Sequence, residues 1–317
     1  MRYSAFGNDQ PVWGRILTAQ PDYVFLLGDQ IYMDYGYFGD EALGEPAFWG
    51  TEKFLPRMRQ KYEEQWAVPG FAELLKRYPR GERLFGIWDD HDFAWNNAYG
   101  NCMPAEKKNG SRALFHEFMK CSRDFDTGKA RDEVYYHVDL IENGARLARV
   151  FFLDNRYHAM PPEKCEKCIA GCTWQADTGS SLFGKEQMDY MRTLIDQSFR
   201  YTVFCTGLTA TQGSSQLCNW GKSYEEFLQI VRTAPRPILL AGDIHDNRFM
   251  PPSKATDKIQ RPFYEIISSG ASQRVAKVVG VPIMKRENWA SLELTTVGAS
   301  VTFLEGTKPT HKTLTFD

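Results

Sequence analysis

Acidic, histidine and tyrosine residues directly follow three apolar, strand-like runs of this sequence. Residues 24–32 read Val-Phe-Leu-Leu-Gly-Asp-Gln-Ile-Tyr, residues 84–92 read Leu-Phe-Gly-Ile-Trp-Asp-Asp-His-Asp, and residues 238–245 read Ile-Leu-Leu-Ala-Gly-Asp-Ile-His. Carboxylates and imidazoles bind metal ions, and the ends of buried parallel strands meet in one crevice. The three runs therefore predict one metal site, assembled from segments that lie far apart in the chain.

The first run ends in Gly-Asp-x-x-Tyr, which offers two kinds of ligand. Asp29 can bridge two cations with its two carboxylate oxygens, and Tyr32 can turn back to bind one of them as a phenolate, a strong ligand for a ferric ion. The alternative is that Asp29 caps the next helix while Tyr32 packs in the core. Taken alone, this motif favours the alternative.

The second run leads into the most unusual segment of the chain. Residues 88–97 contain three acids, one histidine and two carboxamides. The acids would repel one another unless cations or protons neutralised them, so a metal or acid-base role is favoured over a solvated acidic turn. In the third run, Asp243 and His245 stand at i and i+2 and can face one crevice. Capping or surface polarity is the alternative there, but together the three motifs favour a metal site.

The elements that must position these residues follow from the apolar pattern. Strand-like runs alternate with helical spacing between residues 24 and 241, which predicts an α/β fold with a partly parallel sheet. Four further strand-like segments, at 263–268, 290–296, 300–304 and 312–316, are expected to add antiparallel strands to the same sheet. Because the ligands come from near residues 29, 90 and 243, we expect residues 1–317 to form a single domain.

Composition favours some classes of function over others. Hydrophobic residues at 43% and charged residues at 25% are ordinary for a globular protein, and a formal net charge of -2 gives no basic face large enough to predict a nucleic-acid partner from charge alone. A polynucleotide substrate is not excluded. No apolar stretch is long enough to span a membrane, and the N-terminus lacks the apolar core of a secretory signal. We expect a cytoplasmic protein if this is the complete chain. The sequence does not indicate an oligomeric state.

Three of the seven cysteines lie together. Cys165, Cys168 and Cys172 could hold a structural Zn²⁺, with Cys102 or Cys218 as the fourth ligand. Disulfides are the alternative in an exported protein, and free thiols are the alternative in a reducing compartment. These three interpretations remain open.

The ordered set of motifs resembles the PhoD-type alkaline phosphatases, which belong to the calcineurin-like metallophosphoesterases related to purple acid phosphatases. The resemblance rests on Gly-Asp-x-x-Tyr at 28–32, Trp-Asp-Asp-His-Asp at 88–92, Leu-Asp-x-Arg-Tyr at 153–157 and Gly-Asp-x-His at 242–245. Softer matches lie at 8–11, 184–187 and 265–270. The resemblance covers nearly the whole chain, and it implies a sandwich of mixed β-sheets flanked by helices.

The resemblance also implies a role for each residue. Asp29 would bridge two metals, and Tyr32 would bind the ferric one. The remaining ligands would be Asp90, Asn96, Asp243 and His245. His91 would act from outside the metal shell, steadying phosphoryl oxygens or protonating the leaving group. For Arg156, a phosphate contact and a salt bridge to Asp154 are both open.

One position departs from the family pattern. The family supplies a cysteine thiolate to the iron from the end of the first strand, but Gly7 stands where that cysteine is expected, and no cysteine precedes Cys102. Either another group fills that coordination position, or the first metal site is weakened, or the N-terminus has been altered. The expected ions are Fe³⁺ and Ca²⁺, with Mn²⁺ or Zn²⁺ as alternatives.

The expected function is hydrolysis of a small-molecule phosphate monoester or diester. Two cations lower the pKa of a bound water from 15.7 toward about 7, so the resemblance implies direct attack by a metal-bound hydroxide. The alternative is a catalytically weak relative that binds a phosphorylated ligand or nucleotide without turnover.

Overall fold

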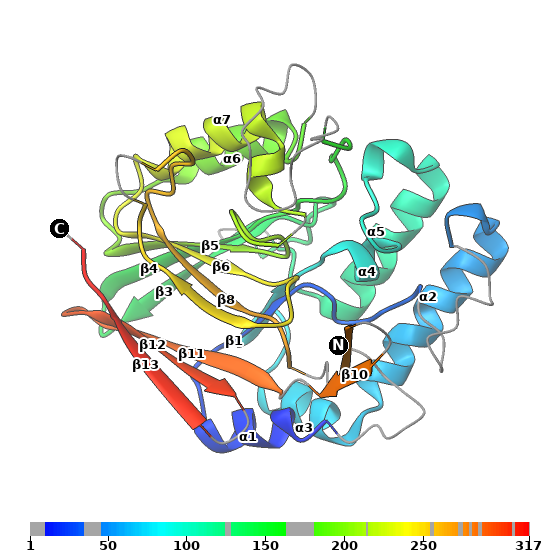
Figure 1. The fold of residues 1–317 in the computed structure, drawn as a ribbon, viewed down its shortest axis with the longest axis horizontal. Coiled ribbons are helices and arrows are strands. Elements are labelled where there is room, and N and C mark those ends of the chain that lie inside the picture. The colour runs from blue at the N-terminus through cyan, green and yellow to red at the C-terminus, as the bar shows by residue number, and fades with distance from the viewer. Residues whose placement is uncertain are drawn as a thin grey trace.

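The computed structural model describes residues 10–34, 46–123, 128–162, 181–213, 215–253, 257–271, 275–278, 281–284, 287–305 and 308–316 (Figure 1). A six-stranded sheet forms its centre, in the order β3-β4-β5-β6-β8-β7. The strands are β3 (Tyr136–Glu142), β4 (Ala145–Phe152), β5 (Tyr201–Thr206), β6 (Pro237–Ala241), β8 (Tyr264–Ser268) and β7 (Asn247–Met250). The four inner strands are parallel, and β3 and β7 pair antiparallel at the two edges.

The other strands form smaller sheets. β1 (Val24–Leu27) pairs parallel with β2 (Leu84–Ile87). An antiparallel sheet contains β11 (Asn288–Leu294), β12 (Ala299–Glu305) and β13 (Lys308–Leu314), and β9 (Val275–Val278) pairs antiparallel with β10 (Val281–Met284). The expectation of one sheet completed by the C-terminal strands is therefore wrong: of the four strands expected there, only β8 joins the central sheet. Burial explains the difference, because β12 alternates between buried and partly exposed residues, as an outer sheet requires, whereas β8 is buried on both faces.

Alternating side chains of the central sheet build two separate cores. Val150 and Phe152 of β4 point into the larger core, while Phe151 points into the smaller one. This is the period-2 alternation of a strand buried on both faces. Helices α6 (Lys185–Leu194) and α7 (Gly221–Val231) cover the face that carries the smaller core (Figure 1).

The opposite face of the central sheet packs against β1 and β2. Phe25 and Phe85 contact Phe152, with ring centroids 5.3 and 5.9 Å apart, and Tyr136 stacks on Phe152 at 4.7 Å. The Tyr136 hydroxyl also donates to the carbonyl of Gly86 and accepts from its N–H, both at 3.0 Å. Aromatic contacts and the two hydrogen bonds of the Tyr136 hydroxyl thus join the two layers into a sandwich.

The remaining α-helices contribute residues to the larger core together with β1 and β2. They are α1 (Val12–Ala19), α2 (Thr51–Trp66), α3 (Pro69–Arg77), the one-turn α4 (Asp90–Phe93) and α5 (Ala105–Met119). Pro69 begins α3 at a position that needs no hydrogen-bond donor. A left-handed Lys120 ends α5. Among the helices of the described ranges, none is both long and apolar enough to cross a membrane.

The carboxyl ends of β1, β2 and β6 approach each other closely. A Cβ atom placed on Gly28 would lie 2.5 Å from the Cβ of Asp89, and one placed on Gly242 would collide with the Leu27 carbonyl oxygen. Only glycine fits such an approach of two backbones. The strand ends that carry the predicted ligands are therefore held against one another.

Replacement of Tyr136 by phenylalanine should weaken the joint between the two layers. The change leaves the buried N–H and carbonyl of Gly86 without their partner, which costs about 1–3 kcal/mol in free energy of unfolding. Urea unfolding measures this loss. Tyr23→Phe, at a residue that is 39% exposed, is the matched control and should leave the unfolding midpoint unchanged. Equal unfolding midpoints for the two variants would contradict the role of the Tyr136 hydroxyl in joining the layers.

Candidate metal centre

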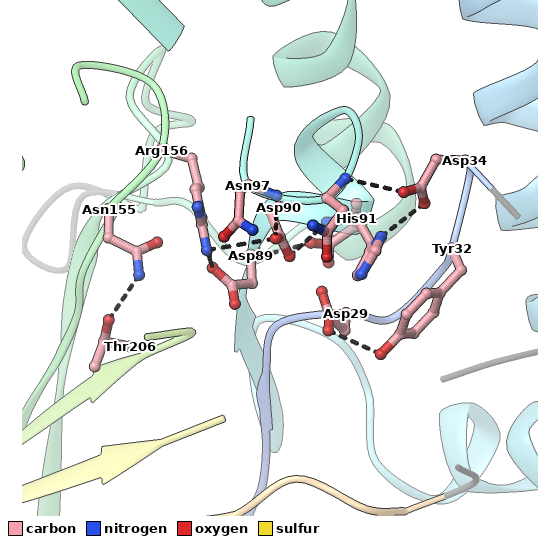
Figure 2. A network of polar contacts seen from close by, with 12 residues as sticks. Asp29, Tyr32, Asp34, Asp89, Asp90, His91, Asn97, Asn155, Arg156 and Thr206 are labelled. Carbon is pink, nitrogen blue, oxygen red and sulfur yellow. Dashed lines mark hydrogen bonds and ion pairs between the residues drawn. The ribbon is translucent and has the colours of Figure 1, made fainter. Parts of the chain in front are cut away.

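Three predicted residues lie together at the strand ends. Ligand atoms of Asp29, Asp90 and His91 all lie within 4.8 Å of one another (Figure 2). Asp29 follows β1, and the other two begin α4, directly after β2. The two carboxylates, one from each of two neighbouring strand ends, are donors suited to a metal ion, and the imidazole lies beside them.

Tyr32 connects this group to the end of β6. Its hydroxyl donates to Asp29 Oδ2 at 3.0 Å and lies 2.7 Å from His245 Nε2. The Tyr32 ring also stacks on His91, with centroids 4.1 Å apart. The first and third sequence motifs, more than 200 residues apart, therefore meet at one phenolic oxygen.

Three of the predicted ligands have a left-handed backbone. The φ angles are 54° at Asp29, 67° at Asp243 and 53° at His245. Such conformations are uncommon outside glycine, cost roughly 1–3 kcal/mol each and concentrate at functional sites. The surrounding structure thus imposes an unusual backbone where the predicted ligands leave the strands.

Only one of the three acids after β2 belongs to the metal group. Asp92 accepts hydrogen bonds from the main-chain N–H of Asp89 at 2.5 Å and from that of Gln30 at 3.2 Å. Asp89 and Asp92 form the capping box of α4. Asp92 therefore connects the loop after β1 to the loop after β2. Of the three acids, Asp89 and Asp92 support the local structure, and Asp90 is the candidate metal ligand.

Arg156 is fully buried behind the centre. Its Nε donates to Asp89 Oδ1 at 2.6 Å, and its Nη2 lies 3.8 Å from Asp90 Oδ2. Its carboxylate partner is thus Asp89. The Asp154 carboxylate instead accepts from the main-chain N–H of Arg156 at 2.9 Å and from the indole of Trp88 at 2.7 Å.

Sequence reasoning missed Asp34. Its Oδ1 lies 2.7 Å from Nδ1 of His91, and its Oδ2 accepts from the main-chain N–H of Asn96 at 2.9 Å (Figure 2). Asp34 comes two residues after Tyr32, and that spacing was the available signal. A carboxylate on one ring nitrogen fixes the orientation of the imidazole.

The two adjacent asparagines have different environments. Both are exposed, and Asn97 donates its main-chain N–H to Asp90 Oδ2 at 2.6 Å, with a left-handed φ of 56°. Figure 2 shows the Asn97 side chain beside Asp90 and Arg156. The sequence named Asn96 as a ligand, but the main-chain contact with Asp90 comes from Asn97.

The electrostatics of the centre suit a cation. Burial raises the pKa of Asp29, and burial together with Asp90 and Asp29 raises the pKa of Asp243 to about 7. Burial opposes ionisation of Asp90 as well, but Arg156 and His91 hold its pKa below the usual value. Burial alone would lower the pKa of His91, yet Asp29 and Asp34 raise it to about 10. A bound cation would relieve the cost of keeping these carboxylates charged, so the residues fit a metal.

Two of the softer sequence matches support the loops around the centre. Gln187 is buried, accepts from the main-chain N–H of Asp154 at 2.8 Å and donates to its carbonyl at 2.7 Å. Glu265, also buried, accepts from the main-chain N–H of Ala210 at 2.6 Å, in the loop after β5. Both residues fix main chain near the strand ends.

The cysteine cluster and the expected cysteine position remain untested. Cys165, Cys168, Cys172 and Gly7 lie outside the described residues. Of the proposed fourth zinc ligands, Cys102 is a free, exposed thiol, while Cys218 is disulfide-bonded.

Comparison with known proteins agrees with these observations. The family model of the PhoD-like phosphatases matches residues 4–290. This chain belongs to the PhoD-like phosphatase family. A solved structure of PhoD superposes with a TM-score of 0.68 at 14% sequence identity, covering 100% of this chain and 70% of that chain. No match is found among curated proteins.

The comparisons confirm the expected family and fold. The family model covers most of the chain, and the structural match confirms an α/β architecture with mixed sheets, of the metallophosphoesterase type. The roles of individual residues are not tested by either comparison and remain predictions.

Asp29→Ala should abolish metal binding. The substitution removes the carboxylate that lies within reach of both Asp90 and His91. Metal content after loading with iron, calcium, manganese or zinc, measured by elemental analysis, checks the result. Asp22→Ala, at an exposed aspartate just before β1, is the control and should retain the wild-type content. Full metal content in Asp29→Ala would show that the centre lies elsewhere.

Proposed function

We propose that this protein is a metal-dependent phosphoesterase that hydrolyses phosphate monoesters or diesters. The observation that carries the proposal is the group of Asp29, Asp90 and His91, gathered at parallel strand ends in a member of a phosphatase family. Ligands at the carboxyl ends of strands are the usual arrangement for sites in α/β folds.

The proposed metal ligands come from all three motifs. They are Asp29, Tyr32, Asp90, Asn96, Asp243 and His245, and the main-chain N–H of Asn97 would hold the Asp90 carboxylate in place. Iron and calcium are the proposed ions, with manganese and zinc as alternatives. When bound, two such ions acidify water and neutralise the charge of the phosphoryl oxygens. Burial and the nearby Asp29 raise the pKa of Tyr32 well above its usual value, so its phenolate form requires a cation beside it.

His91 is the proposed acid of the site. Asp34 accepts at Nδ1, and Nε2 is the nitrogen proposed to face the substrate. From that position the imidazole would steady phosphoryl oxygens or protonate the leaving group. Asp34 would then be a positioning residue, because it acts through His91.

Arg156 is proposed to act by charge rather than by touching the substrate. It is fully buried and paired with Asp89, so a phosphate contact would need a rearrangement of this pair. At 3.8 Å from Asp90, its guanidinium favours the ionised form of a proposed metal ligand. The phosphate contact considered from the sequence is the less favoured role.

Turnover of p-nitrophenyl phosphate and of its bis-ester tests the proposal. We expect hydrolysis that is lost after chelation and restored by one or more of iron, calcium, manganese and zinc, because the buried carboxylates need a cation to assemble the site. Asp22→Ala should match the wild type. Absence of turnover with every ion, together with measurable binding of a phosphate ester, would establish the alternative, a relative that binds without hydrolysing.

His91→Ala should lower turnover by about 10²- to 10⁴-fold while metal content is preserved. If His91 protonates the leaving group, the loss is larger for phenyl phosphate than for p-nitrophenyl phosphate, since p-nitrophenolate leaves without a proton. Equal losses would indicate that His91 steadies the phosphoryl oxygens instead.

The partner variant Asp34→Asn should show the same dependence on leaving group with a smaller loss, roughly 10- to 100-fold. His311→Ala, at an exposed histidine of β13, is the control. Loss of metal from His91→Ala would overturn its role outside the metal shell.

A further inference from the structure

An open cavity lies at the end of the central sheet opposite to the candidate metal centre. Its volume is about 360 Å³, and its lining includes three arginines. Arg200 directly precedes β5 and Arg236 directly precedes β6, whereas Asp243 of the metal centre follows β6. The polar lining residues are Arg146, Gln197, Ser198, Arg200, Arg236 and Thr296. The length of the parallel strands therefore separates this cavity from the metal centre.

The lining carries positive charge without a matching acid. None of the lining residues is acidic. Arg146 is paired, since its Nη1 lies 2.9 Å from Asp196 Oδ2 and donates to Ser198 Oγ at 2.8 Å. The guanidinium of Arg200 donates to the Tyr201 hydroxyl at 3.2 Å and lies over the Tyr201 ring, and within the described ranges neither Arg200 nor Arg236 has an ion pair. Neighbouring guanidinium groups repel one another unless an anion lies between them.

The nearest other cations do not account for this charge. Arg149 is held by Asp139 through two hydrogen bonds, at 2.7 and 2.8 Å, and does not line the cavity. Arg232 pairs with Glu225 at 3.3 Å, and both side chains are exposed. Among the lining arginines, Arg146 is thus matched by an acid, whereas Arg200 and Arg236 are not.

Arg236 occupies a backbone conformation that does not suit it. Its φ is 40°, in the left-handed region that favours glycine or asparagine. It is also partly buried, between the end of α7 and the start of β6. Strain of this kind persists where the surrounding structure fixes it, and it is characteristic of functional positions.

The walls of the cavity are fixed before any ligand binds. The side chain of Gln197 donates to the Thr233 carbonyl at 2.6 Å, which joins the loops that precede β5 and β6. The Tyr201 hydroxyl donates to the carbonyl of Thr295 at 3.2 Å, in the turn between β11 and β12. A rigid frame lowers the cost of holding a ligand.

We propose that this cavity binds a phosphate-like dianion, either inorganic phosphate or the phosphate group of a small organic molecule. Guanidinium groups match the oxygens of a tetrahedral anion and form charge-assisted hydrogen bonds with them. Arg200 and Arg236 supply the unpaired charge, and Arg146 with Ser198 supplies the fixed side. This site is independent of the metal centre and of its activity.

Calorimetric titration with inorganic phosphate and with phenylphosphonate tests the proposal. The titrations use an Asp29→Ala background, in which the metal centre no longer binds the anion. We expect one bound anion per chain and an affinity about tenfold weaker after Arg236→Gly, because a charge-assisted hydrogen bond is lost. Tighter binding of phosphate would assign the free ion, and tighter binding of the phosphonate would assign an organic phosphate.

Arg236→Gly also separates binding from stability. Glycine accepts a φ of 40° without strain, so the variant should unfold at a temperature no lower than its parent while it loses affinity. Arg200→Ala should lose affinity in the same way. Arg232→Ala, an exposed arginine outside the cavity, should bind the anion as its parent does. Unchanged phosphate affinity in both Arg236→Gly and Arg200→Ala, or no binding in the parent, would overturn the proposal.

Discussion

The carboxyl ends of β1, β2 and β6 meet in a space that leaves no room for side chains at Gly28 and Gly242. This close approach determines the backbone conformation of the residues that follow the two glycines. Each strand must turn sharply, and Asp29 and Asp243 enter the left-handed region directly after it. The turns keep both carboxylates at the meeting point of the two layers. The geometry of the candidate metal centre is thus a consequence of how two sheets pack.

Hydrogen bonds that buried carboxylates accept from main-chain N–H groups secure that meeting point. Asp92 joins the loops after β1 and β2, and Asp154 organises the loop after β4. These carboxylates are buried, and their oxygens bind N–H groups. Charge-assisted bonds to the main chain are among the stronger hydrogen bonds in proteins. Acidic residues therefore serve here both as scaffold and as candidate ligands.

Much of the fold could be predicted from the sequence, because most strands and helices show clear apolar periodicity. The parallel strands at 24–27, 84–87, 201–206 and 237–241 appear where the apolar runs stand. Periodicity does not indicate which strands pair with one another. The strands at 288–294 and 299–305 look alike whether they extend the central sheet or form a separate one, and that choice depends on long-range packing.

The candidate site was predicted in outline, since Asp29, Tyr32, Asp90, His91 and His245 do come together. Its finer divisions were not predictable. Nothing in the order of residues distinguishes Asp90 from Asp89, or Asn96 from Asn97, because which of two adjacent residues faces the site depends on the backbone conformation of the loops before and after α4. Asp34 was missed because its partner, His91, lies 57 residues away along the chain. Such pairs follow from tertiary structure alone.

The left-handed backbone at Asp29 and Asp243 has a consequence for how the centre can vary. Asparagine tolerates this conformation as well as aspartate does, and it has nearly the same shape. Exchange between the two residues would change the charge of the centre while the turns keep their course. The total negative charge of the candidate centre can therefore change one residue at a time on an unchanged scaffold.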